Sequence, residues 1–401
     1  MKKIFRMIPA LTCIILLCFI SLELLSRVLI KDPDSDNFLA PCSKEAQDPY
    51  DAKGQCYTSQ DEIAKMEYDT FVGYVPTENE SGVGWKTNAD HFRYDETFSE
   101  KKSKNEFRIF VTGGSAAWGA GVKQDQTFAH LLEKKFGVIY PQKKIRVIIA
   151  AAGAWTSAQE KVFIFNYVKK FSPDMIIMFS GWNDIYHAYT GENYNLQQDF
   201  MHYKKAIQLY VDKSEAVEQK TSNRLSYITP PKYREYHFKF LYLVNKVWYK
   251  HFFKERDILK ALHTIQLSGE KIASNTLESM ELIDYLSKKQ KFILIYCLQP
   301  SLYTTLKKLS AWEQQLDAKF RQQYIGFPEY SVKNYGILIR AIKKDSLEKG
   351  YYFIDADDAI KQEKRSVFAD YVHLGDRGNK LVANYLFDVI VKFNKNLIVK
   401  H

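Results

Sequence analysis

Four short segments, far apart in the chain, carry groups that together can perform acyl transfer. A serine hydroxyl is a poor nucleophile until a neighbouring base takes its proton. A histidine can be that base because imidazole titrates near neutrality, and a carboxylate can hold the ring in the required tautomer. The segments are "VTGGSAAWGAG" with Ser115, "AAGAW" with Gly153, "SGWND" with Asn183, and "FADYVHLGDRGN" with Asp370 and His373.

Three of these residues can also stabilise the oxyanion that forms when a carbonyl is attacked. The backbone N–H groups of Ser115 and Gly153 and the side-chain amide of Asn183 are hydrogen-bond donors. Losing one such donor typically costs about 3 kcal/mol of transition-state stabilisation. A glycine at 153 leaves room for the substrate. The two glycines before Ser115 let the chain turn sharply, so that the hydroxyl faces a cleft.

The elements that must position these residues alternate between apolar strands and amphipathic helices. Five continuous apolar strands separated by helices predict a parallel sheet covered on both faces. The carboxyl ends of such strands share one edge, where ligands bind. We expect the four segments to meet there. Predicted strands cover residues 106–113, 144–153, 175–181, 291–300 and 351–356, and predicted helices cover 127–137, 157–171, 275–290, 333–350 and 377–394.

The order and spacing of these motifs resemble the SGNH hydrolases, the GDSL-like esterase and acyltransferase superfamily, and in particular its membrane-anchored bacterial members. The resemblance covers roughly residues 106–395. It implies a flavodoxin-like three-layer α/β/α sandwich with a five-stranded sheet. Its site roles fall on Ser115 as nucleophile, His373 as base, Asp370 as partner of the base, and Gly153 and Asn183 as oxyanion-hole residues.

One position departs from the motif of that superfamily. Its namesake motif has an aspartate before the serine, and here this position is Gly114. The aspartate is not the base of the nucleophile, so we expect activity to be retained, with a different support for the loop. Three tryptophans, Trp118, Trp155 and Trp182, follow site residues closely and either wall a substrate pocket or pack in the core. We interpret Asp184 as a loop or helix-start residue.

The N-terminus predicts export. "MKKIFR" is basic and is followed by an uncharged apolar run from Met7 to Leu22. We interpret residues 1–30 as an uncleaved signal-anchor, with a cleaved signal peptide as the alternative. The domain that follows would then lie outside the cytoplasm, on the periplasmic side of a bacterial inner membrane. A disulfide between Cys42 and Cys56 would suit that compartment, while Cys297 lies in an apolar strand and is expected to be buried.

Two further regions surround the predicted sheet. Residues 31–105 are rich in turn formers and predict an irregular extension packed on a core domain of residues 106–400. Residues 190–270 interrupt the alternation and predict a helical insertion. Within it, residues 237–257 combine aromatic side chains with lysines on one helical face. They predict either a helix packed on the core, or a lid or a helix that rests on a membrane.

These patterns together predict an exported, membrane-anchored serine esterase or O-acyltransferase that forms an acyl-serine at Ser115. The expected substrate is an acylated glycan, above all an O-acetylated one, or a lipid ester. The net charge of +10 comes without a nucleic-acid module, so we expect no nucleic-acid partner. No CxxC or spaced His/Cys set is present, and no metal or cofactor is implied. The alternative is a non-catalytic envelope protein that keeps the fold for binding or assembly.

Overall fold

The computed structural model describes residues 21–25, 48–51, 65–190 and 266–393. The chain forms two compact units, residues 1–40 with 209–262 and residues 41–208 with 263–401. In the first unit only residues 21–25 are described, and they are helical. The described part of the chain contains no helix that is both long and apolar enough to cross a membrane. Most of the predicted anchor, the Cys42–Cys56 pair and the 237–257 helix fall outside the described residues.

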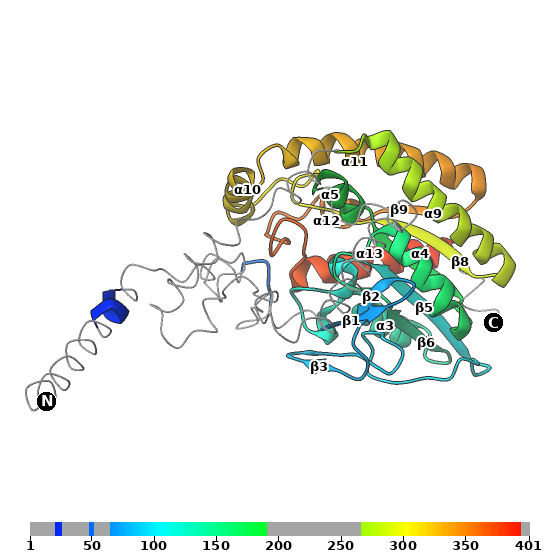
Figure 1. The fold of residues 1–401 in the computed structure, drawn as a ribbon. Coiled ribbons are helices and arrows are strands. Elements are labelled where there is room, and N and C mark those ends of the chain that lie inside the picture. The colour runs from blue at the N-terminus through cyan, green and yellow to red at the C-terminus, as the bar shows by residue number, and fades with distance from the viewer. Residues whose placement is uncertain (1–20, 26–47, 52–64, 191–265, 394–401) are drawn as a thin grey trace, which may run out of the picture. The chain divides into compact units, whose positions relative to one another are not determined.

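A five-stranded parallel sheet forms the centre of the second unit (Figure 1). Its order is β6-β5-β7-β8-β9, so the predicted parallel sheet is confirmed. The central strand β7 is buried along its whole length, which explains why its sequence is a continuous apolar run. Cys297 is buried in β8, as predicted. The strands are β5 (Glu106–Gly113), β6 (Lys144–Ile149), β7 (Met175–Ser180), β8 (Ile293–Leu298) and β9 (Tyr352–Asp355).

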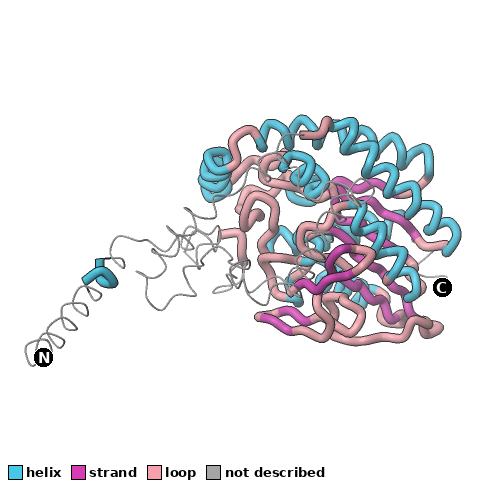
Figure 2. The backbone as a smooth tube through the Cα atoms, in the orientation of Figure 1, coloured by secondary structure: helices cyan, strands magenta, loops and turns pink. Residues whose placement is uncertain are grey.

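Helices form two groups that cover the sheet. In one group α3 packs against α13, and in the other α9 packs against α4 and α11. Figure 2 shows these helices in cyan around the magenta strands. The arrangement agrees with the expected α/β sandwich. These helices are α3 (Phe128–Ile139), α4 (Ser157–Asn166), α9 (Gly269–Gln290), α11 (Phe327–Lys349) and α13 (Asp376–Phe393).

Several elements were not predicted. Helix α10 is strongly polar, and its clearest sequence signal is the capping box formed by Ser310 and Glu313. The others are short, or begin inside the segments that carry Ser115 and Asn183. They are α2 (Ser115–Trp118), α5 (Trp182–Thr190), α10 (Ala311–Gln323), α12 (Asp357–Ile360) and the 3₁₀ turn Gln124–Gln126. The helix predicted over residues 157–171 ends at Asn166 and is followed by a 3₁₀ turn over Val168–Phe171.

The described part of the N-terminal extension contains two small hairpins, and it contacts the sheet domain. They pair β1 (Met66–Asp69) with β2 (Gly73–Pro76) and β3 (Ser81–Gly82) with β4 (Trp85–Lys86). The Tyr74 hydroxyl donates a hydrogen bond to the Gly153 carbonyl at 2.9 Å. The Trp155 indole donates one back to the Tyr74 carbonyl at 3.1 Å. The extension therefore supports a loop at the carboxyl edge of the sheet.

Candidate active site

The loop after β5 requires glycine at its first turn. Gly113 has φ +148°, and a Cβ at this residue would lie 2.3 Å from the Phe179 carbonyl oxygen of the adjacent strand. The chain therefore turns here without a side chain and enters the short helix α2 at Ser115. The first N–H groups of a helix have no acceptor within the helix. The N–H of Ser115 is thus placed where it can bind an anion.

Ser115, His373 and Asp370 form a continuous chain of hydrogen bonds. The Ser115 Oγ lies 2.7 Å from Nε2 of His373, and Nδ1 of His373 lies 2.6 Å from Oδ2 of Asp370. The second carboxylate oxygen of Asp370 accepts the backbone N–H groups of Val372 and His373 at 2.8 and 2.7 Å. Asp370 is only 5% exposed, whereas the other two side chains are half-buried. The carboxylate therefore fixes the imidazole, and the imidazole faces the serine.

The segment with Gly153 runs beside the serine loop. The Ala152 N–H donates to the Gly113 carbonyl at 3.3 Å, which places Gly153 next to Gly114. The amide of Asn183 donates to the Trp155 carbonyl at 2.8 Å from the first turn of α5. The structure thus brings all five residues singled out from the sequence to one edge of the sheet.

The unusual Gly114 lies against the amide of Asn183. A Cβ built on Gly114 would be 2.0 Å from Nδ2 of Asn183 and 3.4 Å from the Trp155 carbonyl oxygen. Any larger residue, aspartate included, therefore requires the Asn183 side chain to move. The sequence led us to expect that the serine loop is supported without the usual aspartate. The glycine at 114 provides this, because it lets the Asn183 amide lie directly beside the loop.

A buried carboxyl group below the site was missed in the sequence. Glu160 on α4 has no exposed surface. Its two oxygens accept hydrogen bonds from Thr112 at 2.7 Å and from Ser180 at 2.5 Å. Thr112 lies three residues before Ser115, and Ser180 lies three residues before Asn183. Glu160 therefore ties the serine loop to the asparagine loop from underneath.

Burial raises the pKa of Glu160 to about 8, although its two hydrogen bonds act in the opposite direction. The folded state then holds a proton that the unfolded state releases near its ordinary pKa of 4.5. Stability therefore falls as the pH rises from about 5 to 8, by up to about 1.4 kcal/mol per pH unit for one proton.

We expect Glu160→Gln to remove this part of the pH dependence, because glutamine does not titrate. Chemical denaturation at pH 5, 6, 7 and 8 measures the free energy of unfolding of both proteins. The variant should gain stability relative to the wild type with each step in pH. A constant difference between the two proteins across this range would show that Glu160 does not carry the extra proton.

Asp184 and the three tryptophans have structural roles in the described fold. The Asp184 carboxylate accepts the Ser157 hydroxyl at 2.6 Å, which joins the start of α5 to the start of α4. Burial raises its pKa above the ordinary range. Trp118, Trp155 and Trp182 are 0%, 1% and 2% exposed. Of the two interpretations of the tryptophans, core packing is the one that this burial supports.

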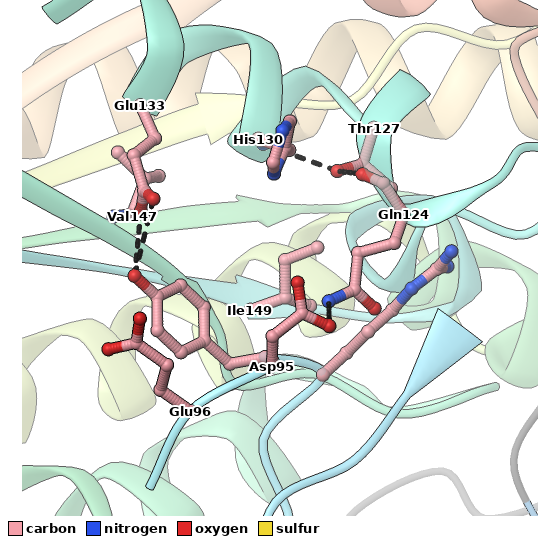
Figure 3. A pocket seen from close by; sticks show the side chains of 10 residues that line it. Asp95, Glu96, Gln124, Thr127, His130, Glu133, Val147 and Ile149 are labelled. Carbon is pink, nitrogen blue, oxygen red and sulfur yellow. Dashed lines mark hydrogen bonds between the residues drawn. The ribbon is translucent and has the colours of Figure 1, made fainter. Parts of the chain in front are cut away.

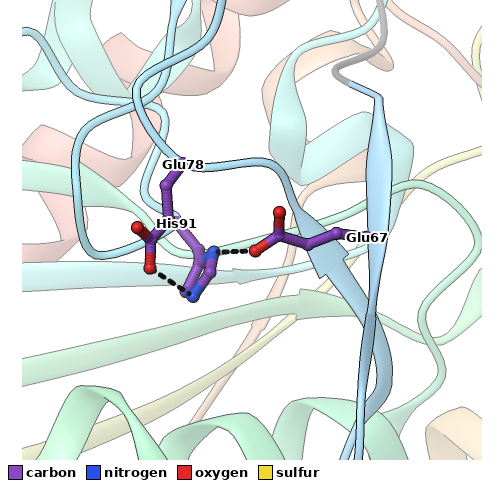
Figure 4. Close-up of side chains that lie close together, drawn as sticks. All are labelled: Glu67, Glu78 and His91. Atoms are coloured by element: carbon purple, nitrogen blue, oxygen red, sulfur yellow. Dashed lines mark ion pairs between the residues drawn. The ribbon is translucent and has the colours of Figure 1, made fainter.

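Two other polar clusters lie in the described residues. A pocket of about 80 Å³ is lined by residues such as Gln124, His130 and Glu133 and contains none of the five predicted site residues (Figure 3). The His91 ring lies between two carboxylates, 3.5 Å from Glu67 at Nδ1 and 3.3 Å from Glu78 at Nε2 (Figure 4).

These three side chains, Glu67, Glu78 and His91, are close enough to share a cation. However, Nδ1 of His91 also contacts the Pro76 carbonyl oxygen at 2.8 Å, and each carboxylate faces a different ring nitrogen. The cluster links β1 to the turn after β2. We interpret it as a structural cluster that ties these segments together.

Several solved structures resemble this fold. An acetyl xylan esterase is 13% identical, with 71% of this chain and 100% of that chain covered and a TM-score of 0.38. A carbohydrate acetylesterase from Sinorhizobium meliloti is 11% identical, with 72% and 99% covered and a TM-score of 0.39. A GDSL-like lipase from Bacteroides thetaiotaomicron is 11% identical, with 74% and 93% covered and a TM-score of 0.37.

No protein-family model matches the chain, and no curated protein matches it.

Proposed function

We propose that the protein is a serine esterase or O-acyltransferase that works through an acyl-serine at Ser115. The observation that carries the proposal is the unbroken chain of hydrogen bonds from Ser115 through His373 to Asp370. A serine paired with an imidazole that is itself held by a carboxylate is the arrangement that activates a hydroxyl for attack on an ester.

The first half-reaction forms the acyl-serine. Ser115 Oγ attacks the ester carbonyl carbon while Nε2 of His373 takes the hydroxyl proton. The attack turns the carbonyl oxygen into an oxyanion. We assign the N–H groups of Ser115 and Gly153 and the side-chain amide of Asn183 as its hydrogen-bond donors. When the intermediate collapses, the bond to the leaving oxygen breaks, and the protonated His373 gives its proton to the leaving alkoxide.

The second half-reaction repeats these steps with a new nucleophile. His373 takes a proton from water or from an alcohol, whose oxygen attacks the acyl carbon. Collapse releases a free acid or a new ester and returns the proton to Ser115. Hydrolysis and acyl transfer therefore differ only in which hydroxyl reaches the acyl-serine.

We further propose that the enzyme is membrane-anchored and acts outside the cytoplasm on an acylated glycan or a lipid ester. The support for the location is the basic and apolar N-terminal sequence, and the support for the substrate class is the esterase chemistry of the site. A protease-protection experiment on intact cells tests the location. Cleavage of the sheet domain only after the outer membrane is opened would agree with a periplasmic domain.

The activity is tested with 4-nitrophenyl acetate and the full-length protein. We expect release of nitrophenol, because a small aryl ester needs only the serine, the imidazole and the oxyanion donors. Adding a sugar alcohol as acceptor separates the two reactions, since a transferase makes a sugar acetate at the expense of free acetate. A folded protein that releases no nitrophenol would contradict the proposal and favour a binding or assembly module.

A further inference from the structure

A second groove opens beside the loop that carries Asp370 and His373. It has a volume of about 490 Å³ and lies between the start of α10 and the segment before Asp370. The site described above does not include any of its residues. The groove is lined by Asp48, Ser310, Ala311, Trp312, Gln315, Arg365 and Ser366.

This groove is joined to the catalytic loop by short contacts. The Trp312 indole donates a hydrogen bond to the Phe368 carbonyl at 3.2 Å. Phe368 pairs with Leu374 in an isolated bridge, and the Ala369 N–H donates to the His373 carbonyl at 2.9 Å. The Trp312 indole therefore contacts the strand-like segment at Phe368 and Ala369, and this segment is hydrogen-bonded to the backbone of the proposed base, His373.

A buried ion pair lies between helix α10 and the segment that leads to Asp370. Glu313 accepts the Val367 N–H at 2.8 Å with one carboxylate oxygen, and its other oxygen lies 2.5 Å from Lys307 Nζ. Both side chains of the Lys307–Glu313 pair are fully buried. Removing one member of such a pair would leave an uncompensated charge. Glu313 therefore links the first turn of α10 to the segment that leads to Asp370.

The lining of the groove suits a neutral, hydroxyl-rich ligand. Arg365 is already paired with Glu363 at 2.9 Å and lies 3.6 Å from Asp51, and Asp48 accepts a hydrogen bond from Ser366. The Arg365 charge is compensated by its acidic partners and Asp48 is an acceptor, so the lining does not favour an anionic head group. Serine, glutamine and the ion-paired groups still present donors and acceptors for hydroxyls.

The apolar part of the lining is small. Ala311 and Trp312 are its apolar members, and the half-buried indole is held in place by its own N–H. An acyl chain needs a predominantly apolar wall, which these two residues do not supply. An aromatic ring with polar side chains around it instead fits a sugar, whose C–H face packs on the ring while its hydroxyls bind the rim.

We propose that this groove is a saccharide subsite, which binds a neutral sugar unit of the acylated glycan while the acyl group reaches Ser115. This inference rests on the proposed esterase function and selects the glycan over the lipid ester. A small aryl ester does not extend into the groove. Only the oligosaccharide should therefore depend on Trp312.

The test compares two substrates, 4-nitrophenyl acetate and O-acetylated xylo-oligosaccharides, with the full-length protein. We expect Trp312→Ala to raise KM for the oligosaccharide about tenfold or more, which is the scale on which one lost stacking contact changes an affinity. Turnover of 4-nitrophenyl acetate should stay within about twofold of the wild type. Trp312→Phe keeps an aromatic face and should retain most of the affinity.

A pair of glutamines on α10 provides the matched control. Gln315 lines the groove, whereas Gln322 is exposed on the same helix outside it. Gln315→Ala should raise KM for the oligosaccharide, and Gln322→Ala should not. An unchanged KM in Trp312→Ala, an equal loss on both substrates, or a wild type that cleaves only the aryl ester would each overturn the subsite. A wild type inactive on both substrates would instead contradict the proposed function.

Discussion

Replacing Ser115 by alanine will abolish turnover of 4-nitrophenyl acetate, and His373→Ala will lower kcat by about 10⁴-fold or more with a small change in KM. The reason is that the two residues act as one unit, in which the serine is reactive only while the imidazole takes its proton. Ser115 Oγ and Nε2 of His373 are 2.7 Å apart and form a direct hydrogen bond. Both values are measured by steady-state kinetics on folded protein.

An exposed serine provides the control for this first prediction. Ser99→Ala removes a hydroxyl that lies on the surface and should leave kcat and KM unchanged. A Ser115→Ala protein that kept more than about a tenth of the activity would contradict the assignment, because the residual rate without the nucleophile comes from binding and oxyanion donors alone.

Gly114→Ala and Asn183→Ala will each lower kcat by about 10²- to 10³-fold, and their effects will not multiply. The loss in Asn183→Ala is that of one oxyanion donor. Gly114→Ala should produce the same loss indirectly, since its Cβ would lie 2.0 Å from Nδ2 of Asn183 and must displace that amide. Once Asn183 is alanine, the added methyl group has no amide to displace.

The double variant Gly114→Ala/Asn183→Ala decides this second prediction. Its kcat should be no lower than that of the less active single variant, because both substitutions remove the same oxyanion donor. Gly137→Ala on α3 is the matched control, since a Cβ there meets no atom within 4 Å. Wild-type activity in Gly114→Ala, or two losses that multiply in the double variant, would show that Gly114 and the Asn183 amide do not act together.

The sheet and its functional edge could be predicted because two simple regularities hold. Strands buried on both faces have continuous apolar sequences, as β7 does from Met175 to Ser180. Their carboxyl ends meet at one edge, so Ser115 and Asn183 could be placed together from their positions alone. His373 followed from its spacing to Asp370.

Other features depend on contacts that sequence periodicity does not record. Glu160 lies in a predicted helix whose apolar spacing does not mark this residue as buried, yet it is fully buried. A signal for it existed, because Thr112 and Ser180 are polar residues at the ends of apolar strands and buried hydroxyls need partners. The role of Gly114 required the position of Asn183, and the groove at Trp312 required the packing of a polar helix against a distant loop.

The central claim is an activated serine at position 115, and covalent labelling tests it most directly. Full-length protein is treated with a fluorophosphonate and its intact mass is recorded, beside Ser115→Ala and His373→Ala. We predict a single adduct on the wild type, no adduct on Ser115→Ala and much slower labelling of His373→Ala. An adduct that persists in Ser115→Ala, or a folded wild-type protein that does not label, would contradict the claim.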